Sequence, residues 1–109
     1  MTMSRQTAPI FPREQQQAQA LGERLRTARL RRRIPVAEMA ARVGVTPKTQ
    51  RRLEKGDTSV GLAMLIRTLS VLGLAKDLDQ IAAQDEIGQR LSDSALPERP
   101  RRSGDRRIS

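Results

Sequence analysis

The feature that most limits how this chain folds is a spacing of small and apolar residues near its middle. Ala40 is followed four positions later by Gly44. Apolar residues flank this pair: Met39, Val43 and Val45. A small residue lets two helices cross closely, glycine adopts a left-handed turn without steric cost, and apolar neighbours bury the bend. The spacing therefore predicts two short helices that pack against each other across a tight turn.

The second of these helices has a clear start, a clear end and a charged outer face. Thr46 is typical of a helix N-cap, and Pro47 suits the first helical position, where an amide hydrogen would have no partner. Gly56 is expected to end the helix. The expected outer face is cationic and carries Lys48, Arg51 and Arg52. This combination is typical of a helix-turn-helix that enters a DNA groove; a purely structural helical hairpin is the alternative.

Hydrophobic periodicity predicts an all-α fold with five short helices. The first is expected to begin at Ala18, because apolar residues recur with helical spacing from Leu21 onward. An apolar stripe over 62–72 predicts the fourth helix, and the fifth follows Gly73. We expect a compact domain over 18–83, a short helical extension over 84–96, and flexible termini formed by a disordered arm over 1–17 and a basic tail over 97–109.

The residue types that the chain lacks narrow its chemistry. Its 109 residues include no cysteine and no histidine, which excludes disulfides, thiolate or imidazole metal ligands and the usual base of a catalytic triad. Phe11 is the sole aromatic residue, which argues against modules that stack unpaired bases on aromatic rings. Asp77 and Asp79 stand two positions apart, on different helix faces, and suit joint acid–base catalysis poorly. We expect no enzyme activity, metal or cofactor.

The net charge of +9 is concentrated in one part of the chain. Residues 18–56 carry eleven basic and three acidic side chains, whereas residues 57–96 carry three basic and six acidic ones. A basic segment beside an acidic one favours a surface that faces a polyanion such as phosphate backbone, with chance clustering as the alternative. The longest apolar run, Leu62–Ile66, is far shorter than the roughly 20 residues of a membrane span, so we expect a cytoplasmic protein.

With these residues in place, the stretch LGERLRTARLRRRIPVAEMAARVGVTPKTQRRLEKG resembles the Cro/cI (Xre) class of helix-turn-helix regulators. The continuation GLAMLIRTLSVLGLAKDLDQIAAQDEIGQRLSDSALPERPRR is more specifically similar to HipB-type antitoxins, which accompany HipA-type kinases. The resemblance to the class covers about Leu21 to Leu78. It implies a lambda-repressor-like domain and a homodimer that binds a palindromic operator in double-stranded DNA and represses its own operon.

The resemblance also implies an ion pair and exposes two departures from the family pattern. An Arg late in the first helix commonly pairs with a Glu near the end of the third, and Arg29 and Glu54 occupy those places. Pro35 and Val36 stand where the family has Ser-Gln, which removes a cap and a phosphate contact. Gln50 stands where an aliphatic residue is preferred. Its amide is either buried without a partner, at a cost of ~1–3 kcal/mol, or turned outward.

Candidate DNA contacts lie on and beside the third helix. We expect base contacts from Lys48, Thr49, Arg51 and Arg52, because lysine or arginine facing guanine is the commonest specific contact and the Thr49 methyl suits thymine. Of these, Arg51 is expected nearest the DNA backbone or a flanking base. We expect phosphate contacts from Thr46, Lys55, Thr58 and Ser59, with simple helix capping as an equal alternative for the hydroxyls.

The fourth and fifth expected helices carry more apolar residues than one small core needs. They predict a dimer surface, with a core-only role as the alternative, and comprise Leu69, Leu72, Leu74, Leu78 and Ile81.

Other functions remain open. The main role is either repression, as an antitoxin or a stand-alone phage-type repressor, or neutralisation of a kinase-like toxin through the acidic surface over 77–93. Non-specific condensation of nucleic acid by the arginine-rich segments is a further alternative.

Overall fold

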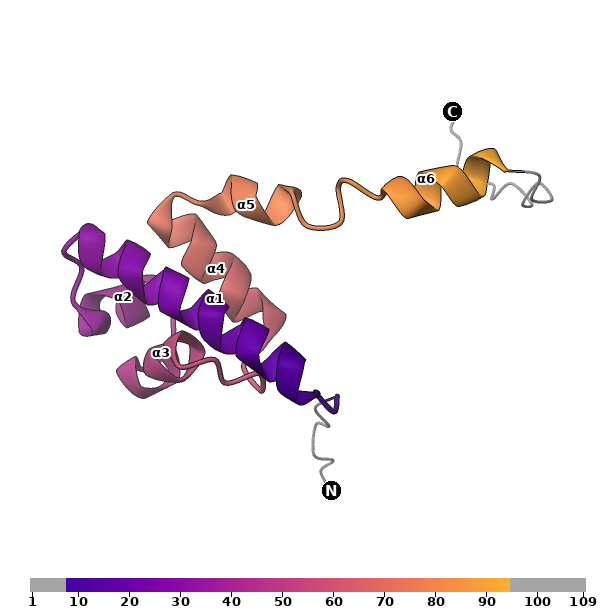
Figure 1. Ribbon diagram of the computed structural model, residues 1–109. Coiled ribbons are helices and arrows are strands. Elements are labelled where there is room, and N and C mark those ends of the chain that lie inside the picture. Colours follow the sequence, from indigo (N-terminus) through magenta and orange to yellow (C-terminus); the bar gives the residue numbers. More distant parts are fainter. Residues whose placement is uncertain (1–7, 95–109) are drawn as a thin grey trace, which may run out of the picture. The chain divides into compact units, whose positions relative to one another are not determined.

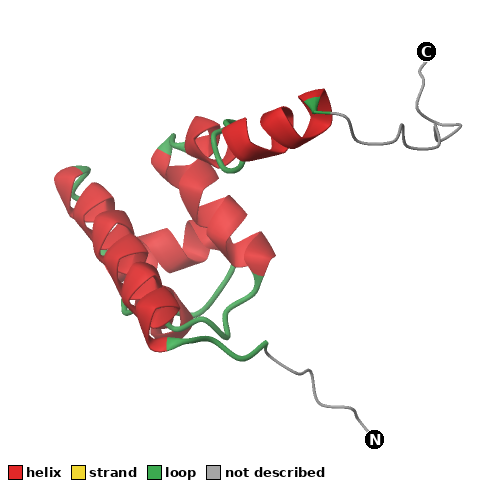
Figure 2. Ribbon diagram, turned by 45° about the vertical axis from the view of Figure 1, so that its right-hand side comes forward, coloured by secondary structure: helices red, strands yellow, loops and turns green. Residues whose placement is uncertain are grey.

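The computed structural model describes residues 8–94, and all regular structure within this range is helical (Figures 1 and 2). The elements are α1 (Pro12–Arg31), α2 (Val36–Val43), α3 (Pro47–Glu54), α4 (Leu62–Leu72), α5 (Ala75–Asp79) and α6 (Glu86–Asp93). The predicted all-α class is confirmed. The predicted basic tail and the first seven residues of the predicted arm lie outside the described residues. None of the helices between residues 8 and 94 has the length and apolar character that crossing a membrane requires.

The chain divides after Asp79 into two compact units, whereas the sequence predicted a boundary at residue 83. The first unit holds α1 to α5. Within it, α1 and α2 each pack against both α3 and α4, and α5 packs against α4. The second unit holds α6, whose N-cap Asp85 accepts a hydrogen bond from the amide of Gly88 at 2.9 Å.

The start of α1 corrects one prediction from the sequence. The helix begins at Pro12 and not at Ala18, so residues 12–17 are helical and not a disordered arm. Pro12 occupies the first helical turn, and a Glu14 carboxylate oxygen accepts a hydrogen bond from the Phe11 amide at 3.0 Å. The Gln15 side chain donates to the Gly56 carbonyl at 2.9 Å and so anchors this extra length to the loop after α3.

One apolar core lies between the first four helices and the connection from α1 to α2. Its buried members are Leu25, Ile34, Met39, Val43, Leu53, Met64, Leu69 and Leu72. Leu69 and Leu72 are 6% and 3% exposed, so they are core residues and the prediction that they face a second subunit is wrong. A domain of this size needs nearly all its large apolar residues to bury enough surface. Leu74 and Leu78 are half-buried against the core, whereas Ile81 remains 67% exposed.

The predicted tight turn between α2 and α3 is confirmed. Gly44 has a left-handed φ of 97°, and its amide donates to the Ala40 carbonyl at 2.8 Å. The Val45 amide donates to the same carbonyl at 2.9 Å. Ala40 is fully buried, as a small residue at a close helix crossing must be. The turn therefore holds α3 against α2 and leaves one side of α3 free of the core.

Candidate nucleic-acid interface

The α3 helix has a buried side and an open side. Its buried residues are Gln50, Leu53 and Glu54. Its N-terminus is capped as predicted, because the Thr46 hydroxyl accepts a hydrogen bond from the Thr49 amide at 3.1 Å. The Thr46 hydroxyl also donates to the Thr49 hydroxyl at 3.0 Å, so the two threonines satisfy each other. Of the two roles left open for Thr46, the geometry supports capping.

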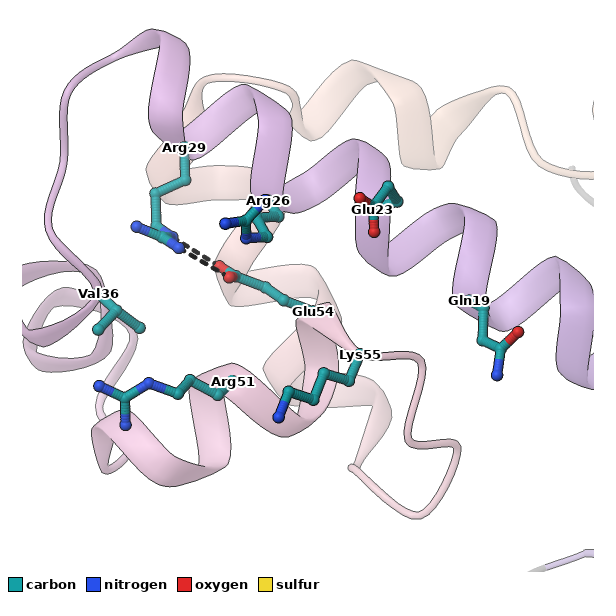
Figure 3. Close-up of a pocket in the computed structure, with 8 residues that line it drawn as sticks. All are labelled: Gln19, Glu23, Arg26, Arg29, Val36, Arg51, Glu54 and Lys55. Carbon is teal, nitrogen blue, oxygen red and sulfur yellow. Dashed lines mark hydrogen bonds and ion pairs between the residues drawn. The ribbon is translucent and has the colours of Figure 1, made fainter.

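The open side of α3 is cationic. Lys48, Arg51 and Lys55 are exposed, and none of them takes part in an ion pair within residues 8–94. Arg51 and Lys55 also line a polar groove of about 680 Å³ between α1 and α3 (Figure 3). Arg26 of α1 lines the same groove. Arg26 was not among the residues predicted from the sequence, although its place three residues before Arg29 puts both on one side of α1.

A buried ion pair fixes α3 to α1. The guanidinium of Arg29 donates through Nε to Glu54 Oε2 at 2.7 Å and through a terminal nitrogen to Glu54 Oε1 at 2.9 Å (Figure 3). Both residues are buried, at 7% and 5% exposure. The other terminal nitrogen of Arg29 donates to the Ile34 carbonyl at 2.9 Å. The hydrogen bonds to Glu54 raise the pKa of Arg29, which stays charged. The pair implied by the family resemblance is confirmed, and it sets the angle of α3.

Gly22 permits the same close approach of the two helices. A Cβ atom at this position would lie 2.5 Å from the Glu54 carbonyl oxygen and 2.7 Å from that of Leu53. Only glycine leaves room for the end of α3 against the middle of α1. This contact could not be predicted from the sequence, because a single glycine inside a helix does not reveal which neighbour approaches it.

The side chain of Arg52 makes contacts that its position in the helix does not predict. Its Nε donates to Asp57 Oδ2 at 2.7 Å, and a terminal nitrogen donates to the Ser59 hydroxyl at 2.7 Å. Asp57 Oδ1 in turn accepts hydrogen bonds from the Ser59 amide at 2.8 Å and the Ser59 hydroxyl at 2.6 Å. The bonds from Ser59, followed by the bond from Arg52, lower the pKa of Asp57 to about 2. Arg52 and Ser59, predicted to contact a base and a phosphate, thus contact each other and Asp57.

The departures from the family pattern are visible in the structure. Pro35 is the N-cap of α2 and provides no side-chain hydrogen bond to that helix, and Val36 is half-buried beside the groove of Arg26. Gln50 is fully buried, and neither atom of its amide has a hydrogen-bond partner among the residues that the structure describes. Of the two placements considered for Gln50, burial is the one observed.

The chain is similar to a protein of known structure and matches one domain family model. One similar solved structure is the crystal structure of the clp gene regulator ClgR from Corynebacterium glutamicum, whose sequence is 26% identical to this chain. The match covers 72% of this chain and 93% of the ClgR chain, with a TM-score of 0.48. No curated protein matches the chain. Residues 20–81, more than half of the sequence, match the family model of the helix-turn-helix domain. The chain therefore belongs to the helix-turn-helix domain family.

Proposed function

We propose that the protein is a sequence-specific regulator of transcription that binds double-stranded DNA, with α3 in the major groove. The observation that carries the proposal is the two-sided character of α3 in a helix-turn-helix chain. One side is buried against the core, and the other presents Lys48, Arg51 and Lys55 without ion-pair partners in the described range. A rigid helix with free cations on its open side matches the shape and the charge of a DNA groove.

The position of each cation suggests its role. Lys48 lies in the first turn of α3, the part of a recognition helix that meets base edges first, and Arg51 follows on the same side. Either side chain facing guanine discriminates against the wrong base by ~1–3 kcal/mol. The Thr49 hydroxyl is bonded to Thr46, which leaves its methyl group for contact with a thymine methyl. Lys55 lies at the end of the helix and contacts phosphate.

Selection of bound fragments from random duplex DNA tests this function. We expect a palindromic consensus with half-sites about one helical turn, ~34 Å, apart. Arg51→Ala should weaken the preference at one base position, and Lys55→Ala should weaken binding to every sequence alike and reduce its salt dependence. Lys76→Ala, which removes an exposed cation from α5, is the matched control and should leave binding unchanged. Binding that falls steeply with salt and selects no sequence would favour non-specific condensation instead.

We further propose that the active form is a homodimeric repressor. One α3 reads few base pairs, and a dimer on a palindrome doubles the contact. Exposed apolar residues of the second unit supply a surface: Ile87 and Leu91 are 65% and 55% exposed and lie four residues apart on one face of α6. Ile87→Asp with Leu91→Asp should convert dimer to monomer in sedimentation and weaken operator binding; an unchanged dimer mass would contradict this interface.

A second candidate function is the neutralisation of a HipA-type kinase by an antitoxin of HipB type. The acidic side chains over 77–93, predicted as a contact surface, are all exposed and comprise Asp77, Asp79, Asp85, Glu86 and Asp93. Exposed carboxylates on the segment after α4 suit a basic protein partner. Affinity capture from the native cell tests this role. Recovery of a kinase that is lost when the five acids are neutralised supports it, and recovery of DNA and the protein itself alone contradicts it.

A further inference from the structure

We propose that Arg52 is a positioning residue that fixes the loop between α3 and α4 for a DNA phosphate, and that it does not read a base. The inference rests on the proposed DNA-binding function and assigns a new role within that site. It starts from the closed set of hydrogen bonds that joins Arg52 to Asp57 and Ser59, which we call the Arg52 clamp.

The clamp engages two of the three nitrogens of the Arg52 guanidinium. Arg52 spans from Asp57 Oδ2 to the Ser59 hydroxyl, and that hydroxyl donates back to Asp57 Oδ1. The Asp57 amide also donates to the Arg52 carbonyl at 3.0 Å, so backbone and side chain hold the same turn. To reach a base, Arg52 would have to release both of its side-chain hydrogen bonds, one to Asp57 and one to Ser59. Such a network is worth more than its separate bonds, because each bond polarises the next.

The charge of Asp57 gives a second reason for Arg52 to stay in place. An uncompensated carboxylate in a loop that meets phosphate would repel the DNA backbone. The guanidinium of Arg52, 2.7 Å from the carboxylate, neutralises it. If Arg52 moved to a base, it would leave that negative charge facing the phosphates. The clamp therefore keeps this part of the surface electrically neutral while Lys48, Arg51 and Lys55 supply the attraction.

The two ends of the loop between α3 and α4 are fixed by Gly56 and Gly61, and between them lie groups that a phosphate could contact. At its start, Gly56 has a φ of 86° and packs so closely on α1 that a Cβ atom there would lie 2.6 Å from the Gln19 Cα. At its end, Gly61 is the N-cap of α4 and supplies no side chain to the amides of the first turn. Those amides and the hydroxyl of the half-buried Thr58 are the groups offered to a phosphate. Ser59 is already engaged and drops out of the predicted phosphate contacts.

Variants of the clamp distinguish positioning from base reading. Arg52→Ala, Asp57→Ala and Ser59→Ala should each weaken binding to the selected operator by about tenfold, because contacts to a charged phosphate lose their alignment. The consensus should stay the same, and Arg52→Ala with Asp57→Ala should be no weaker than Arg52→Ala alone. The sign for Asp57→Ala is decisive, since removal of a negative charge by itself would tighten binding. Replacement of single operator phosphates by methylphosphonates should cost affinity in the wild type at the phosphate beside this loop as well as at the phosphate of Lys55. In Arg52→Ala the cost at the loop phosphate should disappear and the cost at the Lys55 phosphate should remain.

Two readouts separate the clamp from general stability and from the proposed function. Affinities are measured well below the unfolding midpoint of each variant, and hydrogen exchange of the amides over 58–63 is followed in the free protein, where Arg52→Ala should accelerate it. A changed base preference in Arg52→Ala, tighter binding by Asp57→Ala, or unchanged loop exchange overturns the inference and leaves the proposed function standing. A wild-type protein that selects no DNA sequence overturns the proposed function, whatever the loop exchange shows about the clamp.

Discussion

Replacement of Gln50 by methionine should stabilise the protein. Gln50 is fully buried, and both atoms of its amide lack a hydrogen-bond partner among residues 8–94. A buried polar group without a partner costs ~1–3 kcal/mol, whereas an apolar side chain of similar length costs less than about 1.5 kcal/mol in repacking. With two unpartnered atoms relieved, the free energy of unfolding should rise by about 1–3 kcal/mol. A domain of this size gains roughly 4–8 °C in Tm for each kcal/mol.

The measurement is urea and thermal unfolding followed by circular dichroism. Gln17→Met, at an exposed position of α1, is the matched control and should change stability by no more than ~0.5 kcal/mol. Thr68→Val should also stabilise, because the Thr68 hydroxyl is buried and has no partner among the described residues. A Gln50→Met protein that unfolds at the wild-type temperature or below it would refute the reasoning. It would mean that the amide makes a favourable interaction that outweighs its burial.

Three further predictions concern the contacts that hold α3 and its loop. Arg29→Ala should lower the free energy of unfolding by about 3–5 kcal/mol, because it leaves the Glu54 carboxylate buried and unpaired. A loss below about 1 kcal/mol in urea unfolding would mean that the pair is exposed to water and not buried. Gly22→Ala should cost about 1–3 kcal/mol in the same assay. Gly61→Ala, where a Cβ meets nothing within 4 Å and only the N-cap preference for glycine is lost, should cost less than about 1 kcal/mol; equal effects would contradict the close crossing. Because the pKa of Asp57 is lowered from 3.8 to about 2, the stability that it contributes is present above pH 3.8 and lost as the pH falls toward 2. Asp57→Asn should flatten that part of the pH profile of unfolding, and an unchanged acid limb would exclude the clamp as its source.

The parts of the structure that follow from the sequence are those set by local chemistry. Gly44 at the turn and Thr46 as N-cap act on their immediate neighbours, so their roles could be predicted from spacing alone. The Arg29–Glu54 pair was available only through family resemblance, because 25 positions separate its partners. The all-helical class followed from apolar periodicity over the core helices.

The parts that could not be predicted depend on contacts between distant segments. The extra turns of α1 are stabilised at Gly56, 41 positions after Gln15, and the sequence around Pro12 alone favours a loop as much as a helix start. Leu69 and Leu72 have the same apolar character whether a core or a second subunit covers them. The role of Arg52 was also hidden, because a helical position gives the direction of a side chain but not the carboxylate that captures its end.

The buried pair of Arg29 and Glu54, with its third bond to the Ile34 carbonyl, has a consequence for how operators of different lengths can be accommodated. The pair joins α3 to the long α1 helix, so we expect these two helices to move as one rigid unit. If an operator moves its two half-sites apart or rotates them around the duplex, the reading helix cannot swing to follow. Such a change has to be absorbed by the joint between two copies or by bending of the DNA itself. In the proposed dimer, tolerance for spacing is therefore a property of the two assembled copies and not of the single α3 helix.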